Sequence, residues 1–420
     1  MDSKAKKAWF VFILIILVVI ISLFMVKNIP TVNPKNVANL SNKPFNLSNL
    51  SEPKIIAEYN YDSKIEDTAF YDNGTPKVVA TEKEVLFYDP NGKIVRKRTL
   101  AINEQVQISK NGDYIAYVHG SGLMGTRDKM NYEDAKGNIL FEKWLEAQWP
   151  EPSPLGDYLV LTPIGYHDLI EFVGKDGGEI AKYHMGVGGG KGEVKYSTNG
   201  EKCFVASAAA IQPLTAIKIF ENKGGKIIFE NKLAIQEEKL DVSEDGEYWA
   251  ISGYFTIDPW TAGFVYYRND KLLFRKENGA MKIFIAKKGG VVVSTEFYPK
   301  NMKNMLFIAH SKNGNELNRK TVDEFGFSRP GAEITGGVSD VFDNKILFHI
   351  DASTHYSTNP LEKFRVKWLA SLVGIFYLDE GKWLRLKDRD IYDYNYYFKD
   401  TMVSIQNEEK GKIHLTRVGN

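Results

Sequence analysis

The feature that most constrains this chain is a repeat of about 44 residues. Short polar corners recur in front of runs of β-branched and aromatic residues, and in five consecutive copies the corner glycine falls at positions 112, 156, 200, 246 and 290. The corner Ser109-Lys-Asn-Gly112, for example, precedes the run YIAYV. Weaker copies precede runs that begin near residues 77, 346 and 401. Such a regular spacing predicts similar units that stack on one another.

A second polar turn lies between successive corners. In FYDPNGKIVRK (87–97) and KIFENKGGKIIFE (218–230), an Asn/Asp/Gly turn joins two runs of strand-forming residues, which predicts a β-hairpin. A further short run, such as VQIS (106–109), fills the space before the next corner. Each unit is therefore predicted to contain four short strands. Four strands in 40–50 residues are typical of a β-propeller blade.

The two ends of the repeat region are predicted to share one blade. The runs at 401–405 and 412–418 would combine with those at 54–61 and 67–72 to close the ring. With this closing blade, the sequence predicts an all-β propeller of eight four-stranded blades. Seven blades stay possible because the last two repeats are stretched, and a two-domain β-sandwich is the alternative architecture.

The blade pattern across 54–418 resembles known bacterial propellers. Hairpins such as FYDPNGKIVRK resemble blades of pyrroloquinoline-quinone-type and WD-repeat-like propellers, and the Ser-x-Asx-Gly corner is similar to that of periplasmic TolB-type propellers. The Thr-Gly turn and docking Trp of the quinone enzymes are missing, as is the Gly-His…Trp-Asp signature of true WD repeats. The resemblance implies the fold, and no cofactor is expected.

The N-terminal segment is predicted to be a single-pass signal-anchor. Residues Ala8–Val26 contain no charge, and at about 1.5 Å per residue a helix of this length spans about 28 Å, close to the hydrocarbon thickness of a bilayer. Lys4, Lys6 and Lys7 precede the span, so residues 1–7 are expected to be a cytoplasmic tail. Residues 27–53 are rich in Asn, Pro and Ser and are predicted to be a flexible linker. The propeller, 54–420, would then lie outside the cell membrane.

Composition and motifs limit the kinds of ligand and reaction that we expect. The 54 Lys and Arg nearly cancel the 53 Asp and Glu, so we expect no nucleic-acid partner. The single cysteine, Cys203, lies in an apolar run and is expected to be a buried core residue. The Gly-rich segment at 186–192 lacks the spacing of a phosphate loop. His349, Asp351 and His355 could bind a metal, but structural histidines are the preferred interpretation, so no metal ligand or catalytic residue is assigned.

The direction of the strands sorts the turns onto two faces. The tight corners and hairpin turns should share one face, and the longer connections, such as 119–129 and 351–370, should share the other. Binding residues concentrate in loops held by a rigid scaffold, so the long-loop face is the candidate binding face. Its candidate residues are Tyr166, His167, Tyr254, Trp260, Tyr298, Phe327, His355 and Tyr356. The alternative is that these loops fold over the channel as a plug.

We therefore expect a non-enzymatic binding or scaffold module that recognises a protein partner or an envelope polymer through the long-loop face. The alternative is a propeller enzyme, such as a hydrolase, a lyase or a quinone-dependent oxidoreductase, with its site at the channel mouth. Acidic and histidine residues that gather at the channel would favour the enzyme, and an apolar or plugged mouth would favour the binding module. A membrane sensor is a third interpretation, and the short cytoplasmic tail weakens it.

Overall fold

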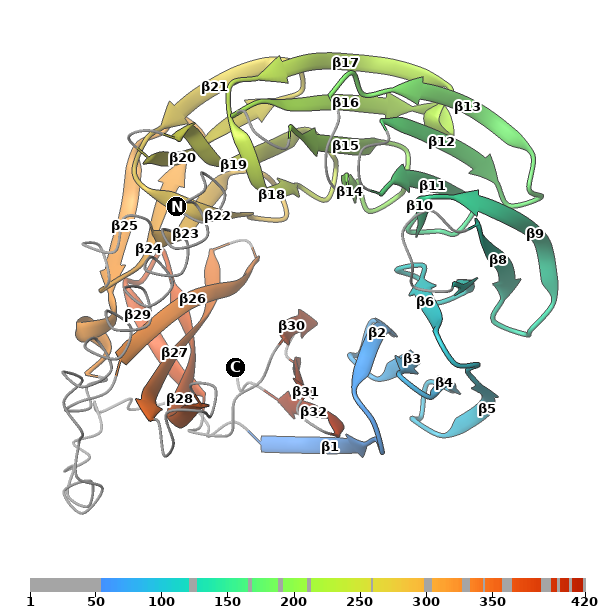
Figure 1. Ribbon diagram of the computed structural model, residues 1–420. Coiled ribbons are helices and arrows are strands. Elements are labelled where there is room, and N and C mark those ends of the chain that lie inside the picture. Colours follow the sequence, from blue (N-terminus) through green and yellow to red (C-terminus); the bar gives the residue numbers. More distant parts are fainter. Residues whose placement is uncertain are drawn as a thin grey trace, which may run out of the picture. The chain divides into compact units, whose positions relative to one another are not determined.

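The computed structural model contains eight antiparallel four-stranded sheets arranged as the blades of a ring (Figure 1). It describes residues 54–417 except 121–126, 165–167, 188–191, 210–212, 258–259, 298–303, 327–332, 343, 357–364, 387–393, 399–400 and 408–409. Within this described part, no helix is long and apolar enough to span a membrane. The predicted tail, membrane span Ala8–Val26 and linker 27–53 lie outside the described residues.

We number the blades in chain order. Within each blade, the strands are named in their order from the ring axis to the outside. Blade 1 comprises β2 (Ile65–Phe70), β3 (Pro76–Thr81), β4 (Glu84–Tyr88) and β5 (Ile94–Thr99), and blade 2 comprises β6 (Glu104–Ile108), β7 (Tyr114–His119), β8 (Arg127–Asp134) and β9 (Ile139–Glu146). Blade 3 comprises β10 (Gln148–Pro152), β11 (Tyr158–Pro163), β12 (Leu169–Gly174) and β13 (Glu179–His184), and blade 4 comprises β14 (Glu193–Tyr196), β15 (Cys203–Ala208), β16 (Thr215–Glu221) and β17 (Lys226–Leu233).

The second half of the chain repeats this order. Blade 5 comprises β18 (Gln236–Val242), β19 (Tyr248–Ile257), β20 (Trp260–Arg268) and β21 (Lys271–Lys276), and blade 6 comprises β22 (Ala280–Ile285), β23 (Val291–Phe297), β24 (Met305–Ser311) and β25 (Glu316–Thr321). Blade 7 comprises β26 (Glu333–Phe342), β27 (Lys345–Tyr356), β28 (Arg365–Tyr377) and β29 (Lys382–Leu386), and blade 8 comprises β30 (Tyr394–Phe398), β31 (Thr401–Asn407), β32 (Gly411–Arg417) and β1 (Lys54–Asn60). The predicted count of eight four-stranded blades is confirmed.

The closing blade differs from the prediction. Its sheet has the order β1-β32-β31-β30, so one strand comes from the N-terminal side and three from the C-terminal side. The predicted fourth strand, 67–72, belongs instead to β2, the innermost strand of blade 1. The prediction was off by one strand because the run after each corner is the second strand of its blade, and the run before the corner is the first.

The polar corners share one turn geometry, which explains why their sequences are similar. In the corner of blade 2, the Ser109 hydroxyl lies 2.7 Å from Asn111 Oδ1 and accepts the amide hydrogen of Tyr114 at 3.0 Å. Gly112 adopts φ 69°, a left-handed conformation that favours glycine. The same φ sign occurs at Gly156, Gly200 and Gly246. In blade 6 the left-handed residue is Gly289, one position before the predicted Gly290.

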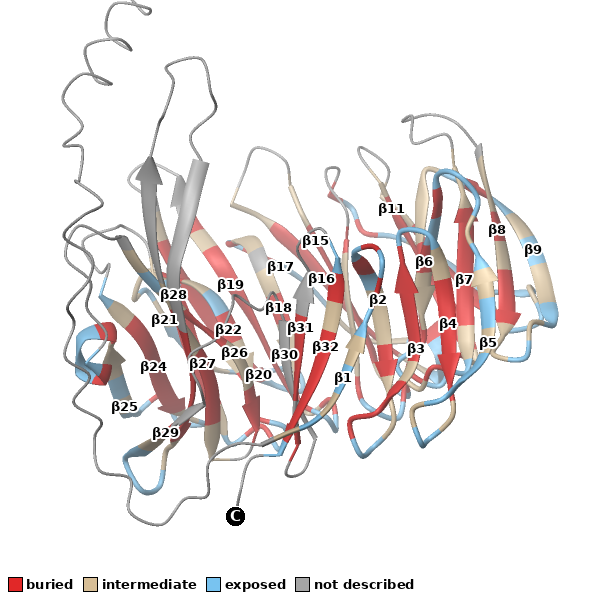
Figure 2. Ribbon diagram, turned by 90° about the horizontal axis from the view of Figure 1, so that it is seen from below, coloured by how far each residue is buried: buried red, intermediate tan, exposed pale blue. Residues whose placement is uncertain are grey.

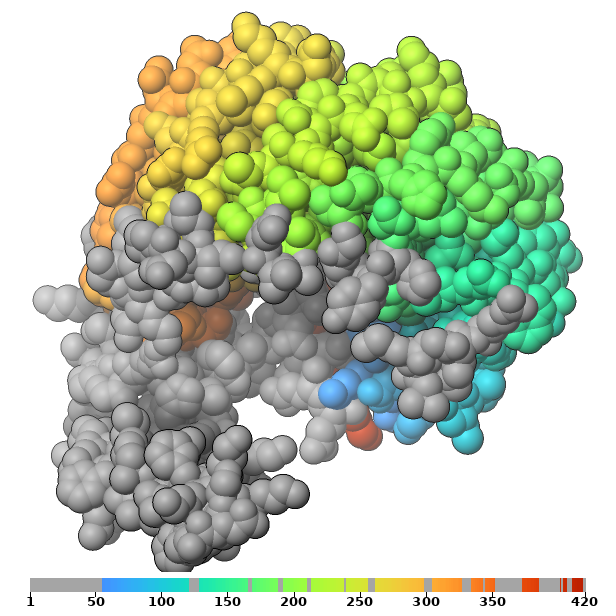
Figure 3. Space-filling view, turned by 45° about the horizontal axis from the view of Figure 1, so that its top comes forward, coloured from blue at the N-terminus to red at the C-terminus, as the bar shows by residue number. Residues whose placement is uncertain are grey.

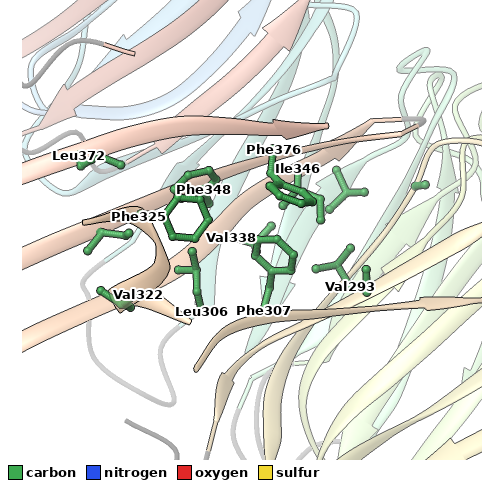
Figure 4. Close-up of a cluster of buried hydrophobic side chains, with 14 residues drawn as sticks. Val293, Leu306, Phe307, Val322, Phe325, Val338, Ile346, Phe348, Leu372 and Phe376 are labelled. Carbon is green, nitrogen blue, oxygen red and sulfur yellow. The ribbon is translucent and has the colours of Figure 1, made fainter. Parts of the chain in front are cut away.

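Apolar packing between neighbouring blades forms the core. Figure 2 shows the middle strands as mainly buried and the short turns at one end as mainly exposed. Figure 3 shows the blades from β6–β9 to β22–β25 following one another in chain order. Among the described residues, the cluster between blades 6 and 7 contains the most buried apolar side chains (Figure 4). There the rings of Phe325 and Phe348 lie 4.6 Å apart, between Leu306, Phe307 and Phe376.

We predict that Phe348→Ala lowers the free energy of unfolding by about 3–5 kcal/mol, because it leaves a cavity in a fully buried interface. Leu317→Ala is the matched control: Leu317 lies on the outermost strand of blade 6 and is 51% exposed, so its loss should cost less than about 0.5 kcal/mol. Chemical denaturation followed by fluorescence measures both variants. Equal losses in the two variants would contradict the interblade core.

Candidate functional site

The first strand of each blade faces the ring axis, and we call these eight strands the inner wall: β2, β6, β10, β14, β18, β22, β26 and β30 (Figure 1). Each is an edge strand of its sheet, so backbone groups on its free side need other partners. The described residues of this wall include many acidic and lysine side chains. The wall is therefore the part of the molecule where polar chemistry converges from several blades.

The densest group on the inner wall lies between blades 4 and 5. Glu193 of β14 has Lys195 Nζ at 3.4 Å and Lys239 Nζ at 3.9 Å from its Oε1 atom. Its other oxygen, Oε2, accepts the amide hydrogen of Leu240 on β18 at 2.6 Å. Glu237 of β18 completes the group. Burial lowers the pKa of Lys239, and the neighbouring Lys195 acts in the same direction.

Glu237 keeps its proton well above the usual pH for a carboxyl group. Burial raises its pKa most strongly, and the charge of Glu193 raises it further. The buried Oε1 atom of Glu237 has no donor in the structure. A hydrogen bond to Glu193 forms only when one of the two carboxyl groups is protonated. Burial and the neighbouring Glu193 thus favour the protonated form of Glu237, and Lys195 and Lys239 lie beside Glu193.

Other carboxylates connect neighbouring inner-wall strands. Asp67 on β2 accepts the amide hydrogen of Ile108 on β6 at 2.7 Å, and Asp241 on β18 accepts that of Ile285 on β22 at 2.7 Å. Burial raises the pKa of Asp67 to about 7 and also raises that of Asp241. In blade 7, burial raises the pKa of Asp340 to about 6. Asp67 and Asp241 thus satisfy edge amides of the next blade, which gives them a structural role, whereas Asp340 accepts the amide hydrogen of its own neighbour Val341.

A hydroxyl–imidazole–carboxylate cluster lies on the first two strands of blade 7. Ser339 Oγ on β26 is 3.1 Å from His349 Nδ1 on β27. The other ring nitrogen, Nε2, is 3.8 Å from Asp351 Oδ2. The His349 side chain is 33% exposed, whereas that of Asp351 is 13% exposed. Burial lowers the pKa of His349, so the imidazole is neutral at pH 7.

The corner turns form a tight rim on the short-turn face. The amide of Asn111 donates to the carbonyl of Pro154 at 3.0 Å, linking the corners of blades 2 and 3. In the same way Thr198 donates to Glu244, and Glu244 donates to Lys287. The side chains of Glu244 and Lys287 also pair at 3.2 Å. This face is therefore held by main-chain bonds between successive corners.

Of the eight predicted binding residues, the structure describes the side chain of Tyr254 alone. Tyr254 is half-buried on β19, opposite Gln236 and Ala262. Trp260, His355 and Tyr356 lie on β20 and β27, but their side chains are outside the described residues. Tyr166, His167, Tyr298 and Phe327 lie wholly outside the described residues. The convergence of these residues on one face stays a prediction.

Two of the predicted long loops are in part strand. The hairpin of β19 and β20 continues to Ile257 and resumes at Trp260, within the predicted loop 253–263. Strand β27 continues to Tyr356 and β28 begins at Arg365, within the predicted loop 351–370.

The structure also describes Cys203 and part of the histidine motif. Cys203 is 1% exposed on β15, and burial raises the pKa of its thiol well above the usual value. Among the described residues, no group of three or more His, Cys, Asp and Glu side chains could hold a metal ion. The described members of the histidine motif, His349 and Asp351, instead face Ser339 and each other.

Sequence reasoning missed the inner-wall residues. Glu193, Lys195, Glu237 and Lys239 lie in the short runs before the corners, which look like ordinary amphipathic strands. The sequence did contain a signal for a charged strand face, because these runs place charges at alternate positions in two successive repeats. Only the ring reveals that both sets face the same axis.

Comparison with known proteins identifies the architecture. No family model matches the chain, and no curated protein matches it. Among solved structures it is similar to BamB from Moraxella catarrhalis, with 11% identity, a TM-score of 0.51 and coverage of 87% of this chain and 99% of that one. The fold is a β-propeller.

Two further solved structures support this fold. The Dos1 propeller is 9% identical with a TM-score of 0.54, covering 87% of this chain and 95% of its own. A eukaryotic initiation factor is 11% identical with a TM-score of 0.51, covering 84% of each chain. At these identities the similarity extends to the fold and not to function.

We predict that Glu237→Gln flattens the pH dependence of stability. The pKa of Glu237 is raised in the folded protein, so the folded state binds a proton that the unfolded state releases above about pH 4.5. This contribution is complete below that pH and is lost as pH rises, by at most about 1.4 kcal/mol per pH unit. In Glu237→Gln, the amide replaces the retained proton as a donor to Glu193.

Denaturation curves between pH 4 and 9 measure this effect. Glu201→Gln, on an exposed corner, is the matched control and should retain the wild-type slope. An unchanged slope in Glu237→Gln would show that Glu237 is ionised in the folded protein.

Proposed function

We propose that this chain is a membrane-anchored, extracytoplasmic binding propeller whose long-connection face recognises a protein partner or an envelope polymer. The proposal rests on the difference in connection length between the two faces of the ring. It is supported by the position of Lys54, where the chain enters the ring on the short-turn face. On its blade pattern alone, we also assign the chain to the bacterial WD-repeat-like and pyrroloquinoline-quinone-type group of propellers.

The ends of the ring meet on the short-turn face. Lys54 pairs with Arg417, at the place where the other blades have the turn between their third and fourth strands. Asn60, at the other end of β1, pairs with Lys412 on the opposite face. A tether that enters at Lys54 therefore reaches the propeller from the short-turn side.

This direction supports an outward-facing binding surface. Residues 27–53, as a flexible coil, have an end-to-end distance of about 30 Å. With the span Ala8–Val26 in the bilayer, the short-turn face lies toward the membrane and the long-connection face points away from it. In sequence, the second and third strands are separated by residues 120–126 in blade 2, 298–304 in blade 6 and 357–364 in blade 7, whereas in the described part of the chain the corners and hairpin turns of the short-turn face are tight. Recognition by loops on a rigid scaffold explains this difference.

We predict that Trp260→Ala and Tyr356→Ala reduce partner recovery when the full-length chain is cross-linked in cells and purified in detergent. A lost aromatic anchor commonly costs about 2 kcal/mol or more of binding energy, or about 30-fold in affinity. Leu155→Ala, at a 47%-exposed corner position on the short-turn face, is the matched control. If all three variants recover the same partners, the assignment of the long-connection face as the binding surface is wrong.

We also predict that an impermeant maleimide distinguishes the two sides of the membrane. Wild type should stay unlabelled because its only thiol, Cys203, is buried with a raised pKa. Leu272→Cys, 46% exposed on the outer rim, should react in intact cells, and Ser3→Cys should react only after permeabilisation. The opposite labelling pattern would reverse the orientation.

A further inference from the structure

The blade 7 cluster has a geometry that binding at the long-connection face does not explain. Its three side chains are ordered as hydroxyl, imidazole and carboxylate, with Ser339 at one nitrogen of His349 and Asp351 at the other. The register opposite β27 slips between Val338 and Asp340, so Ser339 is the extra residue of a β-bulge. Bulges re-aim side chains and are frequent next to active sites.

Residues of blade 6 approach the same imidazole. A Cβ atom at Gly337 would lie 3.4 Å from His349 Nε2 and 3.6 Å from Glu296 Oε1, so the glycine leaves room for both. Glu296 has φ 53°, a strained conformation for a non-glycine residue, and it pairs with Lys282 at 2.8 Å. The Oδ1 atom of Asp351 is buried and has no hydrogen-bond partner among the described residues. Strain and an unsatisfied carboxylate oxygen at one place are typical of functional sites.

We propose that Ser339, His349 and Asp351 form an ester-hydrolysing site on the first two strands of blade 7, with Ser339 as nucleophile, His349 as general base and Asp351 as the residue that orients the imidazole. A nucleophile within hydrogen-bond reach of a base that a third group orients is the arrangement that activates a hydroxyl. The 3.8 Å separation of His349 and Asp351 exceeds a hydrogen bond, and catalytic contacts are often this long before substrate binds. This site is independent of the proposed binding function.

The chemistry balances with water as the only co-reactant. Ser339 Oγ forms a bond to the ester carbonyl carbon while its proton passes to His349 Nδ1. The carbon–oxygen bond to the alcohol then breaks, and His349 returns the proton to the leaving alkoxide, which leaves an acyl group on Ser339. Water attacks this acyl group by the same route in reverse order, releasing the carboxylic acid and the free serine.

The surrounding charges limit the substrate. Lys282 is compensated by Glu296, whereas among the described residues the Asp351 carboxylate has the neutral imidazole of His349 beside it. Anionic esters, including phosphate esters, would meet this negative charge and are disfavoured. The structure therefore points to neutral or cationic carboxylic esters.

The test is covalent labelling of the full-length protein in detergent with a fluorophosphonate probe. We expect one adduct, on Ser339, located by peptide mass, and no adduct in Ser339→Ala. Asp351→Asn and His349→Gln should slow labelling by about 10²-fold or more, the usual contribution of a positioned general base. Thr198→Ala removes an exposed hydroxyl from the short-turn face of blade 4 and is the matched control.

A purely structural Ser339–His349 contact gives a different result. It would leave wild-type Ser339 unlabelled while the protein stays folded, as a thermal melt reports, and that outcome would overturn the proposal. Labelling of Ser339 that does not change in Asp351→Asn would overturn the role of Asp351. The expected rate rises with pH through the lowered pKa of His349 and is then level. Hydrolysis of p-nitrophenyl acetate gives a second readout, which Ser339→Ala should abolish.

Discussion

The apolar contact between neighbouring blades is the interaction on which the rest of the structure depends. A four-stranded blade has two apolar faces and cannot cover either one alone, so each blade is stable only between two others. The clusters around Phe172 and Phe220, and around Phe307 and Phe348, show the same solution at two interfaces. Because each face must be covered, the sheets close into a ring and share a blade between the two ends.

This constraint also creates the polar inner wall. The first strand of each blade is an edge strand whose side toward the ring axis has no strand partner. Asp67 and Asp241 supply acceptors for amides of the next blade, and their raised pKa values reflect the burial that this role requires. The wall therefore holds partly buried ionisable groups near one another. Groups with pKa values shifted in this way are frequent at functional sites and also occur in structural networks.

The sequence predicted the fold well because its strongest signals are local. Corner glycines require a left-handed φ, and hairpin turns require Asn, Asp or Gly, so both leave a visible period. The numbering of strands within each blade was off by one. This error did not change which turns share a face, because successive turns in an antiparallel sheet alternate between its two ends whichever strand is numbered first. The left-handed glycine of the blade 6 corner was placed one residue too late, and the hairpins at 253–263 and 351–370 were predicted as loops, because neighbouring glycines are hard to tell apart and polar strand residues resemble loops.

The chain by itself determined the blade pattern, favoured eight blades over seven and showed that successive turns alternate between two faces, since turn chemistry and strand periodicity act within a few residues. Tertiary structure alone decided which side chains meet. Glu193 and Glu237 lie in successive repeats and become neighbours only when blades 4 and 5 pack. Ser339 reaches His349 only because a bulge shifts the register of β26 by one residue. No local sequence signal marks that bulge, and a shift of one residue is enough to reverse the direction of a side chain.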